Sequence, residues 1–309
     1  MRIIEDVRST GEIFPDLVLT IGSFDGVHLG HQRILNELIG AARARKGTAA
    51  LMTLRPHPRQ FFSPGAAPNL LTAPSKQETL LAEAGLDVLY VLPFHADVAS
   101  MDAGAFVEEI VVRRCRAKQL IVGHDFSFGK DARGNYEYLA AVAPAFGFEV
   151  TEAPALVRQG ERVSSTLIRE CILQGELTRA ENFLGRKYSI VGEVAAGRGI
   201  GVKLGFPTAN LEPRHNAVPA HGVYVAQVLL EGRRYPAAVN IGIAPSIRHE
   251  DILIEAHLLD FDRPIVGRSI EIFFEKRLRP EKKFDSLDHL IAAIAEDVRA
   301  VRAHFGRKP

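Results

Sequence analysis

The pattern of hydrophobic residues changes near residue 185, and this change limits what the chain can fold into. Before it, short apolar runs alternate with segments in which apolar residues recur every three or four positions. After it, short runs rich in β-branched residues follow one another until a last helical pattern near residue 286. Alternating strands and helices favour a parallel sheet, whereas consecutive short strands favour an antiparallel structure. We therefore expect two domains of different class, residues 1–184 and residues 185–309.

Length, composition and charge fit this division. A chain of 309 residues has the length of about two domains, and 47% hydrophobic with 24% charged residues is typical of globular proteins. A net charge of +1 gives no indication of a nucleic-acid partner, and no apolar run approaches the ~20 residues that span a bilayer. The two cysteines, Cys115 and Cys171, lack the spacing of a disulfide framework or a metal site. A reducing, cytoplasmic location is the simplest expectation.

The first half is predicted to be a doubly wound parallel sheet of α/β class. Candidate strands cover residues 17–21, 49–54, 88–92, 120–123 and 146–150, with helical patterns after Gly30, at 75–84 and at 103–115. In such sheets, ligands bind beyond the carboxyl ends of the strands. Functional residues should therefore gather just after each strand.

The turn after the first strand carries the most informative of these residues. It reads Gly22-Ser23-Phe24-Asp25-Gly26-Val27-His28-Leu29-Gly30-His31. Backbone NH groups at a helix start favour an anion, and glycines let a phosphate approach the backbone. The two histidines can donate hydrogen bonds to charge that builds on a phosphoryl oxygen. The alternatives are surface histidines at a helix start or half of a metal site.

Three further segments follow this rule. The second strand leads into Arg55-Pro56-His57-Pro58-Arg59, and the fourth into Gly123-His124-Asp125-Phe126-Ser127-Phe128-Gly129. Aromatic rings in a glycine-flanked loop can sandwich a planar ligand, although a core role also fits them. Later, Val163-Ser164-Ser165-Thr166-Leu167-Ile168-Arg169 places hydroxyls and an arginine at a helix start. This box is either a second phosphate-binding element or a simple helix cap.

Together these motifs resemble the FAD synthetase branch of the nucleotidylyltransferase superfamily, which has a Rossmann-like fold. The resemblance covers residues 1 to about 184 and implies transfer of AMP from ATP to FMN, with release of pyrophosphate. It implies that His28 and His31 are catalytic. The implied nucleotide-binding residues are Gly22, Phe24, Asp25, Gly26, Gly30, Ser164, Ser165, Thr166 and Arg169. The implied flavin-binding residues are Pro56, His57, Pro58, Asp125, Phe126 and Phe128.

The second half is predicted to be a closed antiparallel barrel or a sandwich with a terminal helix. About six short strands are expected, and five apolar runs are visible at 188–194, 223–230, 235–240, 253–259 and 269–278. Glu231-Gly232 has the sequence of a tight hairpin turn. An apolar stripe predicts a final helix from about Ser286 to about Phe305.

One glycine-rich loop in this half has candidate chemistry. It reads Gly197-Arg198-Gly199-Ile200-Gly201-Val202-Lys203-Leu204-Gly205-Phe206-Pro207-Thr208-Ala209-Asn210 and lacks the Gly-Lys-Ser/Thr ending of a Walker A motif. Thr208 and Asn210 offer hard oxygen ligands for Mg2+ on ATP phosphates; the alternative is a barrel corner without chemistry. Glu255 lies within an apolar strand. It is either the acceptor of a hydroxyl proton or one partner of a structural hydrogen bond.

This half resembles the riboflavin kinases from about Gly185 onward. The resemblance is carried by Gly-Phe-Pro-Thr-Ala-Asn at 205–210, Asn-Ile-Gly at 240–242, residues 255–261 and Leu-Arg-Pro at 278–280. It implies that Thr208 and Asn210 hold Mg2+ and ATP, and that Glu255 activates the ribityl hydroxyl. Further implied nucleotide-binding residues are Gly197, Gly201, Lys203, Gly205, Pro207 and Asn240. The family commonly has arginine at Val202, which Arg198 or Lys203 would have to replace, and threonine at Ser246.

Both modules in this order resemble the bifunctional bacterial enzymes of flavin-cofactor synthesis. The implied substrates and products are ATP, riboflavin, FMN and FAD, with Mg2+ as cofactor and without nucleic-acid or membrane partners; oligomerisation is left open. Two alternatives stay open. One module alone is active, with the kinase the more affected because of Val202, or the chain is a regulator that binds flavin and nucleotide without turnover.

Overall fold

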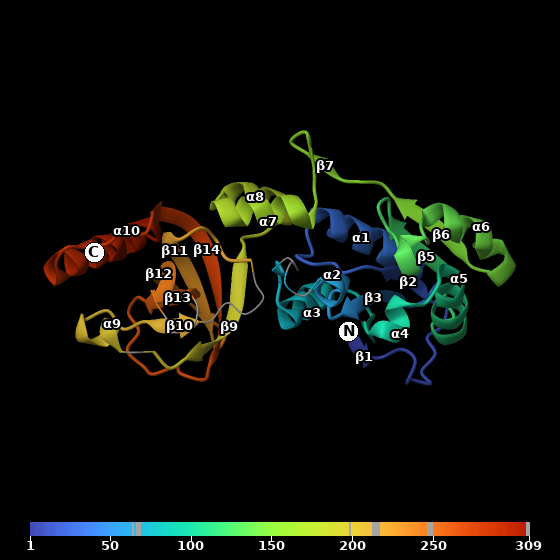
Figure 1. The fold of residues 1–309 in the computed structure, drawn as a ribbon, viewed down its shortest axis with the longest axis horizontal. Coiled ribbons are helices and arrows are strands. Elements are labelled where there is room, and N and C mark those ends of the chain that lie inside the picture. Colours follow the sequence, from blue (N-terminus) through green and yellow to red (C-terminus); the bar gives the residue numbers. More distant parts are fainter. Residues whose placement is uncertain (64, 66–68, 198, 212–216, 246–249, 307–309) are drawn as a thin grey trace. The chain divides into compact units, whose positions relative to one another are not determined.

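The computed structural model describes the whole chain except residues 64, 66–68, 198, 212–216, 246–249 and 307–309. Its internal contacts divide the chain into two compact units, which are described separately (Figure 1). The first unit contains Met1–Pro68 and Pro74–Ser164, and the second contains Asn69–Ala73 and Ser165–Pro309. Residues 165–184 thus group with the second unit, and a functional boundary after residue 184 stays a prediction.

The first unit is built on a parallel sheet of six strands in the order β1-β4-β3-β2-β5-β6. The strands are β1 (Arg2–Glu5), β2 (Val18–Ile21), β3 (Ala49–Arg55), β4 (Val88–Pro93), β5 (Gln119–Gly123) and β6 (Glu149–Ala153). The helices are α1 (Leu29–Ala44), α2 (Pro58–Phe62), α3 (Pro74–Glu83), α4 (Ala96–Ala99), α5 (Ala103–Ala105), π-helix η1 (Phe106–Arg114), 3-10 helix η2 (Lys130–Ala132) and α6 (Tyr136–Phe146). A two-stranded hairpin follows, β7 (Val157–Arg158) and β8 (Glu161–Arg162). The predicted α/β class and parallel sheet are confirmed.

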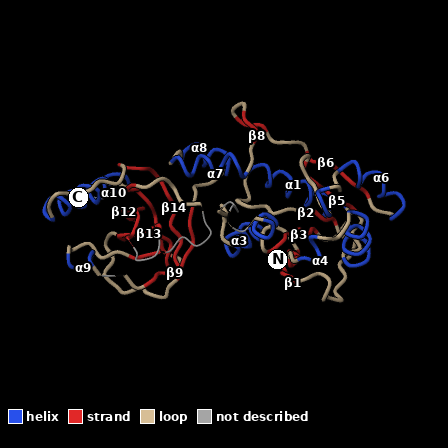
Figure 2. Tube along the Cα trace, viewed as in Figure 1, coloured by secondary structure: helices blue, strands red, loops and turns tan. Residues whose placement is uncertain are grey.

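The sheet is covered by helices on both faces. Alternate residues of its strands enter two separate cores: Leu19, Met52 and Tyr90 pack with η1 and α6, whereas Leu51 and Leu89 pack with α1 and α3. A strand buried on both faces needs apolar residues at every position. This requirement explains why the four central strands are visible as largely apolar runs in the sequence. Figure 2 shows these strands in red and the helices in blue.

The two edge strands differ from the sequence prediction. The strand predicted at 146–150 is wrong in its bounds: Phe146 ends α6, Gly147 closes that helix with a φ of 72°, and β6 begins at Glu149. The strand β1 was missed altogether. Of its four residues only Ile4 is buried, so its composition lacks the apolar run by which an internal strand is recognised.

The helix predicted at 103–115 is confirmed, but most of it is a π-helix. Its buried side chains are Phe106, Val107, Ile110 and Val111. The glutamates of this segment pair with arginines five residues later, Glu108 with Arg113 and Glu109 with Arg114. A π-helix has a wider turn than an α-helix and brings residues at that spacing to the same side.

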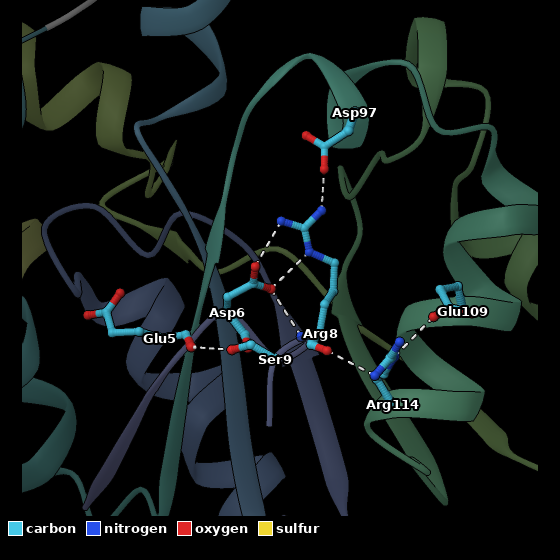
Figure 3. Close-up of polar contacts among 7 residues, drawn as sticks. All are labelled: Glu5, Asp6, Arg8, Ser9, Asp97, Glu109 and Arg114. Atoms are coloured by element: carbon cyan, nitrogen blue, oxygen red, sulfur yellow. Dashed lines mark hydrogen bonds and ion pairs between the residues drawn. The ribbon is translucent and has the colours of Figure 1, made fainter. Parts of the chain in front are cut away.

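An arginine-centred cluster fixes the end of the edge strand β1 (Figure 3). Arg8 donates to Asp6 through Nε and Nη2, at 2.8 and 2.9 Å, and also binds Asp97 in α4. The hydrogen bond from Arg8 holds the pKa of the Asp6 carboxyl below its usual value. Arg114 of η1 donates to the Arg8 carbonyl at 2.9 Å. The cluster therefore connects the segment after β1 with α4 and η1 through polar contacts, beside the apolar core that these elements share.

The second unit contains a closed antiparallel barrel in the order β10-β13-β12-β11-β14-β9. Its strands are β9 (Ser189–Ala195), β10 (Ala209–Leu211), β11 (Gly222–Leu230), β12 (Arg233–Pro245), β13 (Glu250–Leu258) and β14 (Ser269–Arg279), and its helices are α7 (Ser165–Gln174), α8 (Leu177–Leu184), α9 (Ile200–Lys203) and α10 (Leu287–His304). The barrel prediction is confirmed, and the sandwich alternative is excluded. The short strand β10 is the one that the sequence did not reveal.

The predicted terminal helix and hairpin are also confirmed. Helix α10 begins after Ser286, whose side chain accepts from the His289 NH, and it packs through Val301 on the barrel. Arg279 of β14 donates to both carboxylate oxygens of Asp297 in α10, at 3.0 and 2.7 Å. The hairpin turn has φ values of 49° at Glu231 and 79° at Gly232, as a two-residue turn of this type requires. Among the described helices, none combines the length and hydrophobicity that crossing a membrane requires.

Candidate active sites

The first candidate site lies where the order of the sheet reverses. From β2 the chain continues through β3 and β4 toward one edge, and later through β5 and β6 toward the other. At such a switch point the loops leave the carboxyl ends of β2 and β5 in opposite directions and open a crevice for a ligand. The turn that begins at Gly22 follows β2, and the loop containing Asp125 and Phe126 follows β5. The two motif segments predicted from sequence thus leave the sheet at neighbouring strand ends.

The turn after β2 has an unusual backbone. Phe24, Gly26 and Val27 have φ values of 47°, 86° and 38°. Left-handed backbone is costly for residues with a side chain, most of all for a β-branched valine, by about 1–3 kcal/mol each. Such a conformation persists only where neighbouring groups enforce it. The turn also buries Asp25 and His28, which are each 5% exposed.

The histidines of this turn are stacked in one row with Phe24. The ring centroids of His28 and His31 lie 3.6 Å apart, and those of His31 and Phe24 lie 4.5 Å apart. His28 caps α1, because its Nδ1 accepts a hydrogen bond from the His31 NH at 3.2 Å. An accepting Nδ1 carries no proton, so in this tautomer the proton of His28 is on Nε2. His28 is therefore prepared to act as a hydrogen-bond donor through Nε2.

Two glycines of this turn leave little room for a side chain. A Cβ at Gly30 would lie 3.1 Å from Cε1 of His28 and 3.7 Å from the carbonyl oxygen of Val163. A Cβ at Gly22 would lie 3.2 Å from the ring of Phe24. The glycines therefore allow the rings to stack, and the chain that enters the Ser-Ser-Thr box passes beside the turn.

The Pro56-His57-Pro58 turn follows β3 and has a structural role of its own. His57 caps α2 by accepting from the Arg59 NH at 3.2 Å, and Gln60 accepts from the His57 NH at 3.2 Å. Pro58 is the first residue of α2, a position where a missing NH costs nothing. A flavin contact at this turn stays a prediction.

The two aromatic residues of the loop after β5 differ in burial. Phe128 is 9% exposed and packs against Phe126, Phe106 and Tyr138. A Cβ at Gly134 would come within 2.5 Å of the Phe128 ring, so the glycine allows the chain to cover that ring. Phe126 is half-buried, and Asp125 is exposed and paired with Arg162. The core role accounts for Phe128 without a ligand.

Sequence reasoning missed an aromatic cluster beyond the ends of β3 and β4. Phe61, Phe62 and Phe94 contact one another edge to face, with centroids 5.3 to 5.7 Å apart, and Phe62 is 64% exposed. The adjacent phenylalanines directly after the Pro-His-Pro turn were the available signal. Phe94 is buried, while the exposed rings of Phe61 and Phe62 offer a surface for a planar ring.

The serine-rich box begins α7 and is described within the second unit, apart from Ser164. Ser165 is the first residue of α7, and Thr166 and Arg169 lie in its first two turns. Arg169 donates through Nε to the carbonyl oxygen of Asn69 at 2.8 Å. Phosphate binding by this box stays a prediction.

The second candidate site is a row of polar side chains across three strands of the barrel. Asn210 of β10 is in register with Glu255 of β13, and Glu255 is in register with Asn240 of β12. Residues paired in this way project to the same face of a sheet. Asn240 Nδ2 lies 3.4 Å from Glu255 Oε2, a long contact, and all three side chains are half-buried. Three residues singled out separately in the sequence thus lie side by side.

The glycine-rich loop packs directly on this row. A Cβ at Gly197 would lie 1.9 Å from Nδ2 of Asn210, and a Cβ at Gly201 would lie 2.4 Å from the Phe206 carbonyl oxygen and 3.1 Å from Thr208 Oγ1. Gly205 follows α9 with a φ of 86°. Lys203 and Val202 are exposed on α9, while Arg198 and Ser246 lie outside the described residues.

The oxygen atoms around this row fit a hard cation. Within the described residues no group of three or more His, Cys, Asp or Glu has metal-binding geometry. Thr208, Asn210 and Glu255 offer hydroxyl, amide and carboxylate oxygens on one part of the barrel. Mg2+ prefers such ligands and usually shares them with substrate phosphates.

A substitution in the loop tests whether its close packing matters. We expect Gly201→Ala to lower the activity of the barrel site at least about tenfold, because the added Cβ displaces the Phe206 carbonyl and crowds Thr208. The measurement is the rate of product formation by each half of the chain. Gly40→Ala is the matched control: Gly40 is an exposed residue of α1 with open space around it, and the change should add about 0.5–1 kcal/mol of stability. Equal activities of the two variants would contradict the prediction.

Comparisons with known proteins match both halves of the chain. The model of the FAD synthetase family matches residues 11–167, and the model of the riboflavin kinase family matches residues 184–305. The chain is 37% identical over 308 residues to the bifunctional riboflavin kinase/FMN adenylyltransferase of Escherichia coli K12, covering 99% of this chain and 98% of that protein. It is 36% identical over 306 residues to the protein of the same name from Haemophilus influenzae, covering 99% of both.

A solved structure has the same fold over nearly the whole chain. It is a crystal structure described as a macrolide-efflux protein from Streptococcus pneumoniae, with a TM-score of 0.86 and 30% sequence identity. The match covers 98% of this chain and 99% of that one.

Proposed function

Because the chain belongs to the family of bifunctional riboflavin kinases/FMN adenylyltransferases, we propose that its two candidate sites divide the two reactions between them. The chain is a transferase that phosphorylates riboflavin to FMN with ATP and adenylylates FMN to FAD. One observation supports this assignment of one reaction to each site. The in-register row Asn210–Glu255–Asn240 lies in one unit, and the histidine stack lies at the switch point of the sheet in the other. Each is a separate arrangement suited to phosphoryl chemistry.

The turn after β2 is the proposed adenylyltransferase centre. An oxygen of the FMN phosphate attacks the α-phosphorus of ATP, and the bond to pyrophosphate breaks. His28, through Nε2, and His31 donate hydrogen bonds to the oxygens on which negative charge builds. Gly22, Phe24, Asp25, Gly26 and Gly30 shape the backbone against the nucleotide. Ser164, Ser165, Thr166 and Arg169 are kept as proposed phosphate contacts.

The flavin of this reaction is proposed to bind near the aromatic residues at the carboxyl edge of the sheet. Phe61 and Phe62 offer the exposed rings, and the earlier candidates Pro56, His57, Pro58, Asp125, Phe126 and Phe128 are kept in the proposal. Phe128 lies in the core and anchors the loop that carries Asp125 and Phe126.

The barrel row is the proposed kinase centre. Glu255 accepts the proton of the ribityl hydroxyl, whose oxygen attacks the γ-phosphorus of ATP while the bond to ADP breaks. Asn240 Nδ2 lies 3.4 Å from the carboxylate of Glu255, as a long contact beside it. Thr208 and Asn210 would hold Mg2+, which neutralises phosphate charge when bound. Gly197, Gly201, Gly205, Lys203 and Pro207 are the proposed contacts of the loop with the nucleotide.

Two buried cysteines support the proposed cytoplasmic location. Cys115 and Cys171 are both buried and neither forms a disulfide, and burial raises the pKa of the Cys115 thiol to about 12. A Cys115 thiol that stays protonated has no role as a nucleophile, and the assignment of Cys171 rests on its burial alone. Both cysteines are therefore interpreted as small core residues of a protein kept in a reducing compartment.

The product pattern tests the proposal against its alternatives. Purified protein with riboflavin, ATP and Mg2+ should form FMN first and then FAD, as resolved by chromatography, and chelation of Mg2+ should stop both. FMN alone from riboflavin would support an active kinase module only, and FAD from supplied FMN but not from riboflavin would support an active adenylyltransferase module only. Binding without turnover of either flavin would support a flavin-sensing regulator. The fold shared with the macrolide-efflux protein does not decide among these, because a fold hosts many functions.

A further inference from the structure

Gln77 of α3 is one of the few buried polar side chains of the first unit, with 6% of its surface exposed. Its amide Nε2 donates to the carbonyl oxygen of Ser23 at 2.6 Å, and its Oε1 accepts from Nη2 of Arg55 at 3.2 Å. Gln77 therefore connects the turn that follows β2 with the end of β3.

These partners leave Gln77 only one amide orientation. Arg55 carries donors alone, and the Ser23 carbonyl is an acceptor, so Oε1 faces the guanidinium and Nε2 faces the turn. Arg55 is itself held by Glu78 of α3 at 2.7 Å. The orientation of the Gln77 amide is thus fixed by the ion pair of Arg55 with Glu78. Thr53 Oγ1 makes a second, longer contact with the same Ser23 oxygen, at 3.5 Å.

A second glutamine holds the other end of the same turn. Gln32 Nε2 donates to the Val27 carbonyl oxygen at 2.9 Å. Ser23 and Val27 bracket the segment that contains the left-handed residues Phe24 and Gly26, and Val27 itself is left-handed. A backbone this strained needs enforcing contacts, and the two amide donors supply them at both ends.

We propose that Gln77 is a positioning residue for adenylyl transfer, which acts by holding the Ser23 carbonyl so that the turn presents His28 and His31 in their stacked arrangement. The inference rests on the proposed function of that turn. Gln77 touches no reacting atom in this account. Its effect comes from geometry, because a displacement of about 1 Å in a catalytic group can lower a rate about a hundredfold.

The test compares Gln77→Ala with a matched glutamine. Gln119 also accepts from an arginine, Arg45, and donates through Nε2 to Thr151 at 3.1 Å. It is the first residue of β5, however, and so lies at the amino ends of the strands, whereas the turn lies at their carboxyl ends. Gln77→Ala should lower kcat for FAD formation about 10- to 100-fold with less than about a threefold change in the KM for ATP. Gln119→Ala should change neither constant more than about twofold. Both should keep the riboflavin kinase rate of the other unit.

Two further variants separate positioning from folding. Gln77→Glu keeps the size of the side chain and the acceptor for Arg55 but loses the donor to Ser23, so it should reproduce the loss in kcat; it decides the matter if Gln77→Ala unfolds the first unit. In a His31→Ala background, Gln77→Glu should change FAD formation less than about twofold, because residues that act as a unit are not additive.

Three results would overturn the inference. The first is a Gln77→Ala or Gln77→Glu protein as active as Gln119→Ala, the second is a loss confined to KM, and the third is an undiminished Gln77→Glu effect in the His31→Ala background. Failure of the proposed function is distinguishable, since His28→Ala and His31→Ala would then leave FAD formation unchanged whatever Gln77 does.

Discussion

Replacement of His28 or His31 by alanine is expected to lower FAD formation from FMN and ATP by about a hundredfold or more, while FMN formation from riboflavin continues. The magnitude is that of losing one preorganised donor to transition-state charge. The geometry makes the two losses interdependent, because His31 stands between His28 and Phe24 in the stack. Steady-state rates of the two half-reactions, measured separately on each variant, check this expectation.

His28 needs a control for its structural role. Its Nδ1 caps α1, and loss of a cap costs about 1 kcal/mol of stability. His28→Asn keeps a capping side chain and should restore the unfolding temperature without restoring FAD formation. A folded histidine variant that lost both half-reactions would contradict the assignment of these residues to one site.

Replacement of Glu255 by alanine should produce the opposite pattern. We expect FMN formation to fall by about 10²–10⁴-fold, the contribution typical of a general base, while FAD still forms from supplied FMN. Glu255 occupies the centre of the polar row, with Asn210 and Asn240 on the strands to either side. Chromatography of products from riboflavin and from FMN distinguishes the two activities.

Glu255→Gln distinguishes a role of Glu255 as general base from a role as partner in a structural hydrogen bond. Glutamine keeps the shape of the side chain and an oxygen within reach of Asn240 but accepts no proton at neutral pH. Glu271→Gln is the matched control, since Glu271 is also a half-buried carboxylate on a barrel strand, where it accepts from Ser189 Oγ at 2.6 Å. If Glu255→Gln formed FMN as fast as Glu271→Gln, Glu255 would have a structural role only.

Much of the fold could be predicted because buried positions recur at regular spacing and are occupied by apolar residues in the sequence. The central strands of the sheet are covered on both faces and appear as apolar runs, and Ser286 marks the start of the last helix by its capping chemistry. The placement of the histidine turn beyond the carboxyl end of its strand follows from the same pattern and the rule for parallel sheets, whereas its place at the switch point required the strand order. The edge strand β1 and the three-residue β10 show no such pattern, since pairing with neighbours rather than composition defines them.

The candidate sites were predictable as motifs but not as geometry. Strand register is a property of long-range pairing, so no local pattern could show that Asn210, Glu255 and Asn240 share one row. Phe128 entered the core because Gly134 allows the chain to cover its ring, which residue type alone does not reveal. Gln77 carries no motif at all; its role emerges only when Ser23 and Arg55 are brought to either end of its amide.

The separation of the two sites is tested most directly by mixing two full-length variants, each of which lacks one of the two activities. His31→Ala protein should convert riboflavin to FMN only, and Glu255→Ala protein should convert FMN to FAD only, so neither alone makes FAD from riboflavin and MgATP. Combined in one reaction, they should restore FAD from riboflavin, because FMN released by the first is a substrate for the second. A mixture of folded proteins that accumulates no FAD would contradict the account.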